Sequence, residues 1–248
     1  MAGHSKWANI QHRKGRQDKK RAKLFTKLIN EITVAARIGG GDQDSNPRLR
    51  AAVDKAKSQS MPKDNIDRAI VKGSGGDEGS NLEEVTYEGY GPGGVAILIE
   101  CLTDNRNRTV AEVRHALTKF GGKLGTEGSV AYIFQQIGLL SLSKVKDPDN
   151  IMEIAIETGA EDIDINDDDS IDIVTSPSAF MDVKDALNNK DILFNISEIT
   201  MKASNEVLID KSNSESLFKL LDMLEDLDDV QSVHSNAEVP EDILRNIN

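Results

Sequence analysis

The sequence is poor in cysteine, the residue that forms the disulfide bonds of small secreted proteins and binds many metal clusters. Its single cysteine, Cys101, can form neither an internal disulfide nor a thiolate metal cluster, a usage that fits a reducing cytoplasm. The longest uncharged run, residues 128–143, contains Gln135 and Gln136 and is shorter than the ~20 apolar residues of a membrane-spanning helix. We therefore expect a cytoplasmic protein that has no membrane partner.

Motifs for nucleotide, metal and catalytic chemistry are also missing. The glycine-rich segments lack the spacing and the lysine of a phosphate-binding loop. The acidic run at residues 162–169 matches the first three ligand positions of a calcium-binding EF-hand, but Asp167 replaces the required Gly and Ile173 the required Glu. A strand pair with an acidic turn explains this run better. The four histidines have no Cys partner and suggest no triad. We expect no enzyme activity, cofactor, metal or small-molecule substrate.

Basic residues are scarce after the first third of the chain. Residues 1–72 contain 17 Lys and Arg against 7 Asp and Glu, a net charge of +10, so residues 73–248 hold the other 13 and 35, a net charge of −22. The first 27 residues alone carry nine Lys or Arg, one acid (Asp18) and the only tryptophan, Trp7. This asymmetry favours a polyanionic partner such as nucleic acid, although charge alone is equally consistent with a solvated helical face.

The basic part is predicted to be a small all-α domain of three helices, residues 1–75. Apolar residues recur at helical spacing from Asp18 to about Ile38, and Arg16, Lys20, Lys23 and Lys27 would share the opposite stripe. Asn46 and Pro47 have the residue types of an N-cap and first helical position. A third helix is expected from Pro62.

The Gly- and Ser-rich segment 72–80 is predicted to be a linker, followed by two α+β domains of ferredoxin-like type. Domain 2 is expected to comprise residues 80–137 and 201–240. Its predicted elements are strands at 85–90, 95–102 and 129–134, a helix at 109–120, and a tail with strands at 206–209 and 230–233 around a helix at 215–227. The apolar second strand should be central.

Residues 138–200 are predicted to form domain 3, inserted in domain 2. Their expected elements follow the order βαββαβ of a ferredoxin-like unit, with strands at 139–142, 163–165, 171–174 and 193–199 and helices at 149–158 and 178–187.

A second basic group, Arg106 and Arg108, occurs at the start of the predicted helix of domain 2. Arginine beside a helix N-terminus is electrostatically unfavourable, so an anion bound there would be favoured twice. The alternative is that Asn107 caps the helix and both arginines pair with local acids such as Glu112. The two interpretations are equally supported.

Several long motifs resemble the YebC family of bacterial proteins, whose mitochondrial relatives include the translational activator of cytochrome c oxidase subunit I. The motifs are MAGHSKWANIQHRK, KLFTKLINEI, GGGD, NPRLRAAVDKA, NIDRAIVKG, YEGYGPGGVAILIECLTDNRNRTVAEVRHAL and GSVAYIF. The resemblance implies three domains, the first all-α and the other two α+β.

The resemblance also implies non-enzymatic nucleic-acid binding. Family members are described as probable DNA-binding transcriptional regulators, and others as ribosome-associated factors that help translation, including through proline-rich stretches. The sequence leaves both open, with a protein-interaction module as a third alternative; the partner is DNA or ribosomal RNA. The residues expected to contact nucleic acid are Lys6, Trp7, Arg13, Lys14, Arg16, Lys19, Lys20, Arg21, Lys23, Lys27, Arg48, Arg50, Lys55, Arg106 and Arg108.

Overall fold

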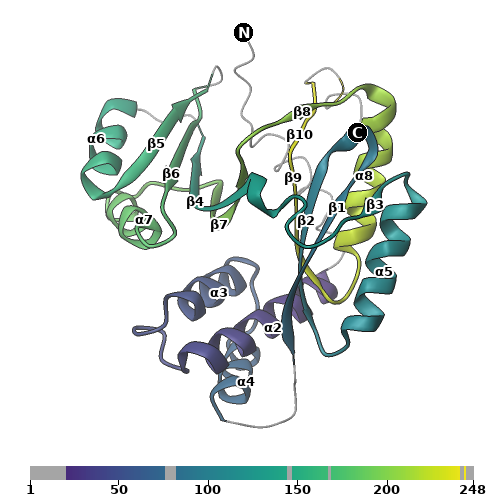
Figure 1. Cartoon of the computed structure of the whole chain (residues 1–248). Coiled ribbons are helices and arrows are strands. Elements are labelled where there is room, and N and C mark those ends of the chain that lie inside the picture. Colours follow the sequence, from purple (N-terminus) through teal and green to yellow (C-terminus); the bar gives the residue numbers. More distant parts are fainter. Residues whose placement is uncertain (1–20, 76–81, 144–146, 167–168, 241–242, 244–248) are drawn as a thin grey trace. The chain divides into compact units, whose positions relative to one another are not determined.

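The computed structural model describes residues 21–75, 82–143, 147–166, 169–240 and 243. These described residues divide into two compact units: one comprises residues 21–75, 82–131 and 207–237, and the other centres on the described part of residues 132–206. The fold class is α+β, as predicted, with helices and antiparallel sheets (Figure 1). The three-domain division and its boundaries remain a prediction. None of the described helices is long and apolar enough to cross a membrane.

The first unit begins with three helices, α2 (Arg21–Gly39), α3 (Pro47–Ser58) and α4 (Lys63–Ser74). Asn46 caps α3 as predicted, since its side-chain oxygen accepts a hydrogen bond from the Leu49 N–H. The predicted start of the first helix, Asp18, lies outside the described residues. One shared core joins the helices and includes Leu28, Ile32, Leu49, Val53, Ile66 and Ala69.

Gly73 allows α2 and α4 to approach closely. A Cβ atom at this position would lie 2.3 Å from the Thr33 carbonyl oxygen of α2, closer than any real contact. The helix pair therefore requires glycine here.

The first sheet has the strand order β3-β1-β2-β9 and is antiparallel throughout. The strands are β1 (Glu83–Tyr90), β2 (Ala96–Thr103), β3 (Lys123–Leu124) and β9 (Val230–Ser235). The apolar strand β2 is central, as predicted, and Cys101 is buried in it. Helices α5 (Arg106–Lys119) and α8 (Lys211–Glu225) cover one face of this sheet (Figure 1). The turn between β1 and β2 contains the short helix η2 (Pro92–Gly94).

The predicted strand at residues 129–134 is wrong. This segment contains a turn and the short helix η3 (Ala131–Ile133), because the buried Glu88 carboxylate takes the backbone donors that a strand would offer to its neighbour. Its Oε1 accepts from the Gly128 N–H at 2.6 Å, and its Oε2 accepts from the Val130 and Ala131 N–H groups at 2.6 and 2.7 Å. The sheet ends instead with the two-residue strand β3.

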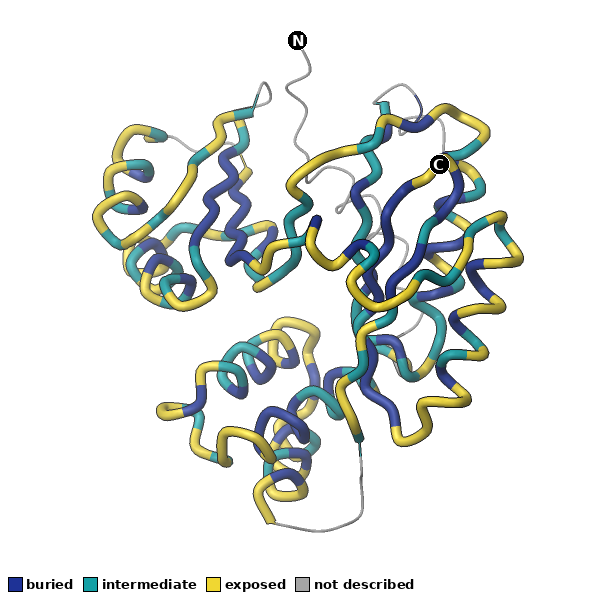
Figure 2. Tube along the Cα trace, in the orientation of Figure 1, coloured by how far each residue is buried: buried dark blue, intermediate teal, exposed yellow. Residues whose placement is uncertain are grey.

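The second unit contains the elements β4 (Phe134–Leu142), α6 (Pro148–Thr158), β5 (Ala160–Ile165), β6 (Ile171–Thr175), α7 (Phe180–Asn188) and β7 (Ile196–Ala203). The chain order is thus βαββαβ, and the antiparallel strands are arranged as β5-β6-β4-β7. The central strands β4 and β6 are the most deeply buried (Figure 2). The acidic run begins within β5, which pairs with β6 as the sequence predicted.

Two short strands, β8 (Val207–Leu208) and β10 (Ala237–Glu238), form a separate two-stranded sheet. Strand β10 was not predicted. Helix α8 begins at Lys211, four residues before the predicted start, because Asp210 caps it by accepting from the Asn213 N–H at 2.8 Å.

Candidate nucleic-acid interface

Seven of the fifteen predicted nucleic-acid-binding residues cannot be placed. Lys6, Trp7, Arg13, Lys14, Arg16, Lys19 and Lys20 lie outside the described residues. Arg21 is the first residue of α2, and its side chain is not described. The other predicted residues lie in α2, in α3 and in the first turn of α5.

Lys23 and Lys27 of α2 contact the C-terminal end of α8. The Lys27 ammonium donates to the Glu225 carbonyl at 2.6 Å, and the Lys23 ammonium donates to the Asp226 carbonyl at 2.7 Å. Lys23 also lies 3.2 Å from the Asp228 carboxylate. Lysines are favourable there because the last carbonyls of a helix have no partner within it and carry partial negative charge. Both side chains therefore have a structural role.

Arg48 of α3 is bound by two carboxylates. Its Nε and Nη2 donate to the two oxygens of Glu31 at 2.7 and 3.1 Å, and Nη2 also donates to Glu84 at 2.5 Å. Burial alone would lower the pKa of the Arg48 guanidinium, but the hydrogen bonds to Glu31 and Glu84 outweigh it and raise the pKa. The charge of Arg48 is thus largely compensated within the protein.

Arg50 and Lys55 differ from Arg48 in their surroundings. The Arg50 guanidinium donates to the carbonyls of Gln43 and Asp44 at 3.0 and 2.8 Å, so it holds the loop before α3, and it pairs with no carboxylate among the residues that the structure describes. Lys55 is exposed on α3. Arg50 keeps more of its positive charge for an external partner than Arg48 does.

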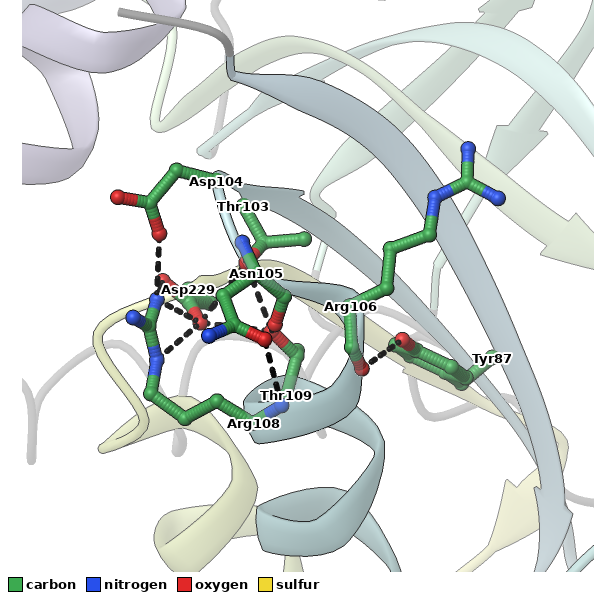
Figure 3. Close-up of polar contacts among 8 residues, drawn as sticks. All are labelled: Tyr87, Thr103, Asp104, Asn105, Arg106, Arg108, Thr109 and Asp229. Carbon is green, nitrogen blue, oxygen red and sulfur yellow. Dashed lines mark hydrogen bonds and ion pairs between the residues drawn. The ribbon is translucent and has the colours of Figure 1, made fainter.

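The second basic group forms a polar cluster around Asp229, which lies just before β9 (Figure 3). Arg108 Nη2 donates to both Asp229 oxygens at 2.8 and 2.7 Å, and its Nε donates to Oδ2 at 3.2 Å. The hydroxyls of Thr103 and Thr109 donate to the same Oδ2 at 3.1 and 2.7 Å. The Asp229 side chain is only 13% exposed. One buried carboxylate therefore ties α5 to the end of β2 and the start of β9.

Further acids neutralise the two arginines. Arg108 also bonds Asp104 at 3.0 Å, and the hydrogen bonds to Asp229 and Asp104 raise the pKa of the Arg108 guanidinium. Arg106 Nε donates to Glu83 at 2.6 Å. The interpretation in which local acids pair with both arginines agrees with these contacts, although Glu112 is not the partner of either.

The capping residue of α5 is Asn105, and the alternative that used Asn107 is wrong. The Asn105 side-chain oxygen accepts from the Arg108 backbone N–H at 3.1 Å. The backbone N–H of Asn105 donates to the Thr103 hydroxyl at 2.9 Å (Figure 3). Helix α5 consequently starts at Arg106, and the anion near its N-terminus is Asp229. The carboxylate compensates the unfavourable position of the arginines.

Other groups with chemical potential have structural partners. The Glu100 carboxylate accepts from the Ser232 hydroxyl and lies 3.0 Å from His234 Nε2. Since the serine bonds the carboxylate, these residues do not have the serine–histidine contact of an activated nucleophile. Burial raises the pKa of the Cys101 thiol to about 12. Within the described part, no group of three or more His, Cys, Asp or Glu side chains is arranged to hold a metal ion.

Two family models match the chain: the TACO1/YebC protein N-terminal domain over residues 5–76, and the TACO1/YebC second and third domain over residues 82–237. The chain belongs to the TACO1/YebC family. The resemblance inferred from the motifs is thereby confirmed.

Similar TACO1/YebC relatives span the whole chain. A "Probable transcriptional regulatory protein" of Coxiella burnetii (strain Dugway 5J108-111) is 60% identical over 244 residues, which cover 98% of this chain and 100% of the relative. A protein of the same name from Francisella tularensis subsp. novicida (strain U112) is 57% identical over 247 residues, 100% of both chains. The crystal structure of a conserved hypothetical protein from Aquifex aeolicus has a TM-score of 0.83 and 46% identity, and covers 96% of this chain and 98% of its own.

Sequence reasoning missed three residues of the polar cluster around Asp229 in this TACO1/YebC chain: Asp229 itself, Thr103 and Thr109. Asp229 belongs to an acidic stretch with Asp226 and Asp228, and nothing local distinguishes it from them. Thr103 and Thr109 are almost fully buried polar residues, which the sequence shows only as the flanks of the arginine motif. The cluster is visible only after β2, α5 and β9 are brought together.

Proposed function

We propose that this TACO1/YebC protein is a non-enzymatic regulator of gene expression that binds DNA by contacts to its phosphates. The names of the Coxiella and Francisella relatives support a role in transcription. The charge contrast between the basic first 72 residues and the acidic remainder supports a polyanionic partner held at one end of the chain.

The proposal rests mainly on which cations of residues 1–72 already pair with groups of the protein and which part of the segment holds the remaining positive charge. Lys23 and Arg48 are each paired with carboxylates, and Lys27 with a helix C-terminus. Residues 1–20 contain six Lys or Arg and one acid, so they hold +5 of the +10 net charge of residues 1–72. The strongest phosphate contacts are therefore expected from Lys14, Lys19, Lys20 and their neighbours.

The test compares two triple variants that lose the same charge. Lys14, Lys19 and Lys20 are changed to Ala in one, and the exposed Lys190, Lys211 and Lys219 of the acidic part in the other. DNA affinity is measured by fluorescence anisotropy over a range of salt concentrations. The first variant should lower the slope of log affinity against log salt by ~0.9 for each lost contact to duplex DNA, and the second should leave it unchanged. Equal slopes would remove the basic segment from the interface.

A second candidate function is an RNA- or ribosome-associated translation factor. Trp7 favours it, because an aromatic side chain within a basic segment can stack on an unpaired base. A transcriptional regulator should bind its operator ~10³-fold or more tighter than random duplex at physiological salt. Absence of such a preference, together with co-sedimentation with ribosomes, would favour translation instead.

A further inference from the structure

Helix α5 is an exception in the charge distribution of the acidic part of the chain. Residues 106–123 hold five of the 13 Lys and Arg of residues 73–248 and only one of their 35 Asp and Glu. The five are Arg106, Arg108, Arg114, Lys119 and Lys123. An uneven placement of this kind makes one helix a local basic surface on an acidic body.

Helix α5 presents four of these residues to solvent, all except Lys123, which belongs to β3. Its buried side consists of Thr109, Val113, Ala116 and Leu117, which face the first sheet. The exposed side contains Asn107, Ala111, Arg114, His115, Thr118 and Lys119. Asn107, Ala111, Arg114 and Thr118 follow steps of four, three and four, so they form one row along the outer face. Helix α5 lies on the outside of the first sheet (Figure 1).

The cations of residues 106–123 fall into two groups. The acids Glu83, Asp104 and Asp229 compensate Arg106 and Arg108 in the first turn. Among the described residues, by contrast, Arg114 has neither a hydrogen bond nor an ion pair. The Lys119 ammonium lies 5.5 Å from the ring centre of Phe120, and the ammonium of Lys123, in β3, lies 5.4 Å from that of Tyr90. No carboxylate in the described part of the chain pairs with either lysine.

Arg114 is the most informative of these residues. Lys119 belongs to the last turn of α5, where the helix dipole alone favours a cation. Arg114 is in the middle of the helix, where neither the dipole nor a local acid accounts for it. Arg114 and Lys119 are ~8 Å apart along the axis. The neighbouring exposed side chains of the outer face, Ala111, His115 and Thr118, are small or flat, so an extended polyanion can approach closely.

We propose that the outer face of α5, centred on Arg114 and Lys119, is a second contact surface for the sugar–phosphate backbone of nucleic acid. Arginine and lysine are the side chains that bind phosphate most strongly, and the positive surface matches the charge of the backbone. This inference rests on the proposed nucleic-acid-binding function and adds a surface outside the basic N-terminal part. It also assigns the phosphate contacts of this helix to Arg114 and Lys119 instead of the predicted Arg106 and Arg108, because acids pair with those two arginines.

The experiment compares Arg114→Ala/Lys119→Ala with Lys211→Ala/Lys219→Ala in the full-length chain. The control lysines are exposed on α8, in the same compact unit. Binding to a labelled single-stranded RNA and to a labelled duplex DNA is measured over a range of salt concentrations. The α5 variant should lose on the order of tenfold in affinity at low salt and lower the salt slope by ~1.4 to 1.8, for two contacts of ~0.7 to 0.9 each, while the α8 variant matches the unchanged chain. The RNA and DNA probes show which backbone the surface prefers.

The conservative variant Arg114→Lys/Lys119→Arg separates charge from shape and should retain the wild-type slope. A photo-crosslinking residue at Ala111 should label the nucleic acid, whereas the same residue at the exposed Ser212 of α8 should not. Three results together would contradict only the α5 surface: the unchanged chain binds, the Lys14/Lys19/Lys20 variant loses binding, and the α5 variant matches its α8 control. The outer face of α5 would then not contact nucleic acid, while the proposed function would stand. If the unchanged chain binds neither probe, the proposed function fails and the inference fails with it.

Discussion

Asp229 supports three side chains from two other elements, so its removal should cost more than the loss of an ordinary surface acid. Changing Asp229 to Ala leaves Arg108 without its main partner and takes an acceptor from the buried hydroxyls of Thr103 and Thr109. We expect the free energy of unfolding, measured with urea, to fall by about 2 kcal/mol. Asp228→Ala is the matched control, because this neighbouring carboxylate is 81% exposed and its loss should change stability by no more than about 0.5 kcal/mol. Equal effects would show that the cluster is dispensable.

Glu88 should make stability dependent on pH. Burial alone would raise the pKa of its carboxyl, but hydrogen bonds from the Val130, Gly128 and Ala131 N–H groups outweigh it and lower the pKa below the ordinary 4.5. A carboxyl whose pKa is lowered by folding stabilises the protein above its unfolded pKa, and this contribution is lost as the pH falls through the folded value.

Glu88→Gln tests this dependence, since the amide keeps one acceptor oxygen and places an NH₂ group against a backbone donor. We expect a loss of about 2 kcal/mol near neutral pH, and a smaller difference from wild type as the pH falls below 4.5 toward the lower folded pKa. Urea unfolding at a series of pH values measures both. Glu127→Gln, an exposed change in the same loop, should have no such profile. A pH-independent difference would contradict the assignment.

At the scale of elements, two asparagine caps differ in what else they hold. Asn46 caps α3 and also donates from Nδ2 to the carbonyls of Ala35 and Gly40 at 2.9 and 2.8 Å, so one buried side chain joins the end of α2 to the start of α3. The exposed Asn105 side chain accepts one N–H at the start of α5. Asn46→Ala should therefore cost about 2–3 kcal/mol and Asn105→Ala about 1 kcal/mol. Thermal unfolding of both variants compares the costs; similar losses would mean that the additional bonds contribute nothing.

The accuracy of the predicted elements follows the range of the interactions that form them. Asn46-Pro47 predicted the start of α3 correctly because the capping signal is complete within a few residues. The start of α5 was ambiguous between Asn105 and Asn107, and Thr103 and Asp229 decide it in favour of Asn105. The strand predicted at residues 129–134 failed because Glu88, some 40 residues away, takes its backbone donors.

At the scale of the whole molecule, the described cores contain no residue before Leu24. Deletion of residues 1–20 should therefore leave a cooperatively folded protein whose melting temperature changes by no more than about 2–4 °C, while nucleic-acid binding is lost. Deletion of residues 1–27 is the contrasting variant. It also removes Leu24 and Phe25, which pack against the helical core, and the two lysines of α2 that bind the C-terminal end of α8. Circular dichroism during heating measures both, and loss of the cooperative transition on the shorter deletion would show that the basic segment is part of the fold.

The sequence by itself determined the α+β class, most helices and strands, the family, and the separation of a basic beginning from an acidic remainder. These depend on periodicity, capping residues and composition, which are properties of neighbouring residues. Tertiary structure alone decided which cations are compensated. Arg108 meets an aspartate 121 residues away and Lys27 a carbonyl 198 residues away, whereas Arg114 meets no acid among the described residues. Electrostatic interaction depends on distance in space, and the fold sets that distance for residues far apart in the chain.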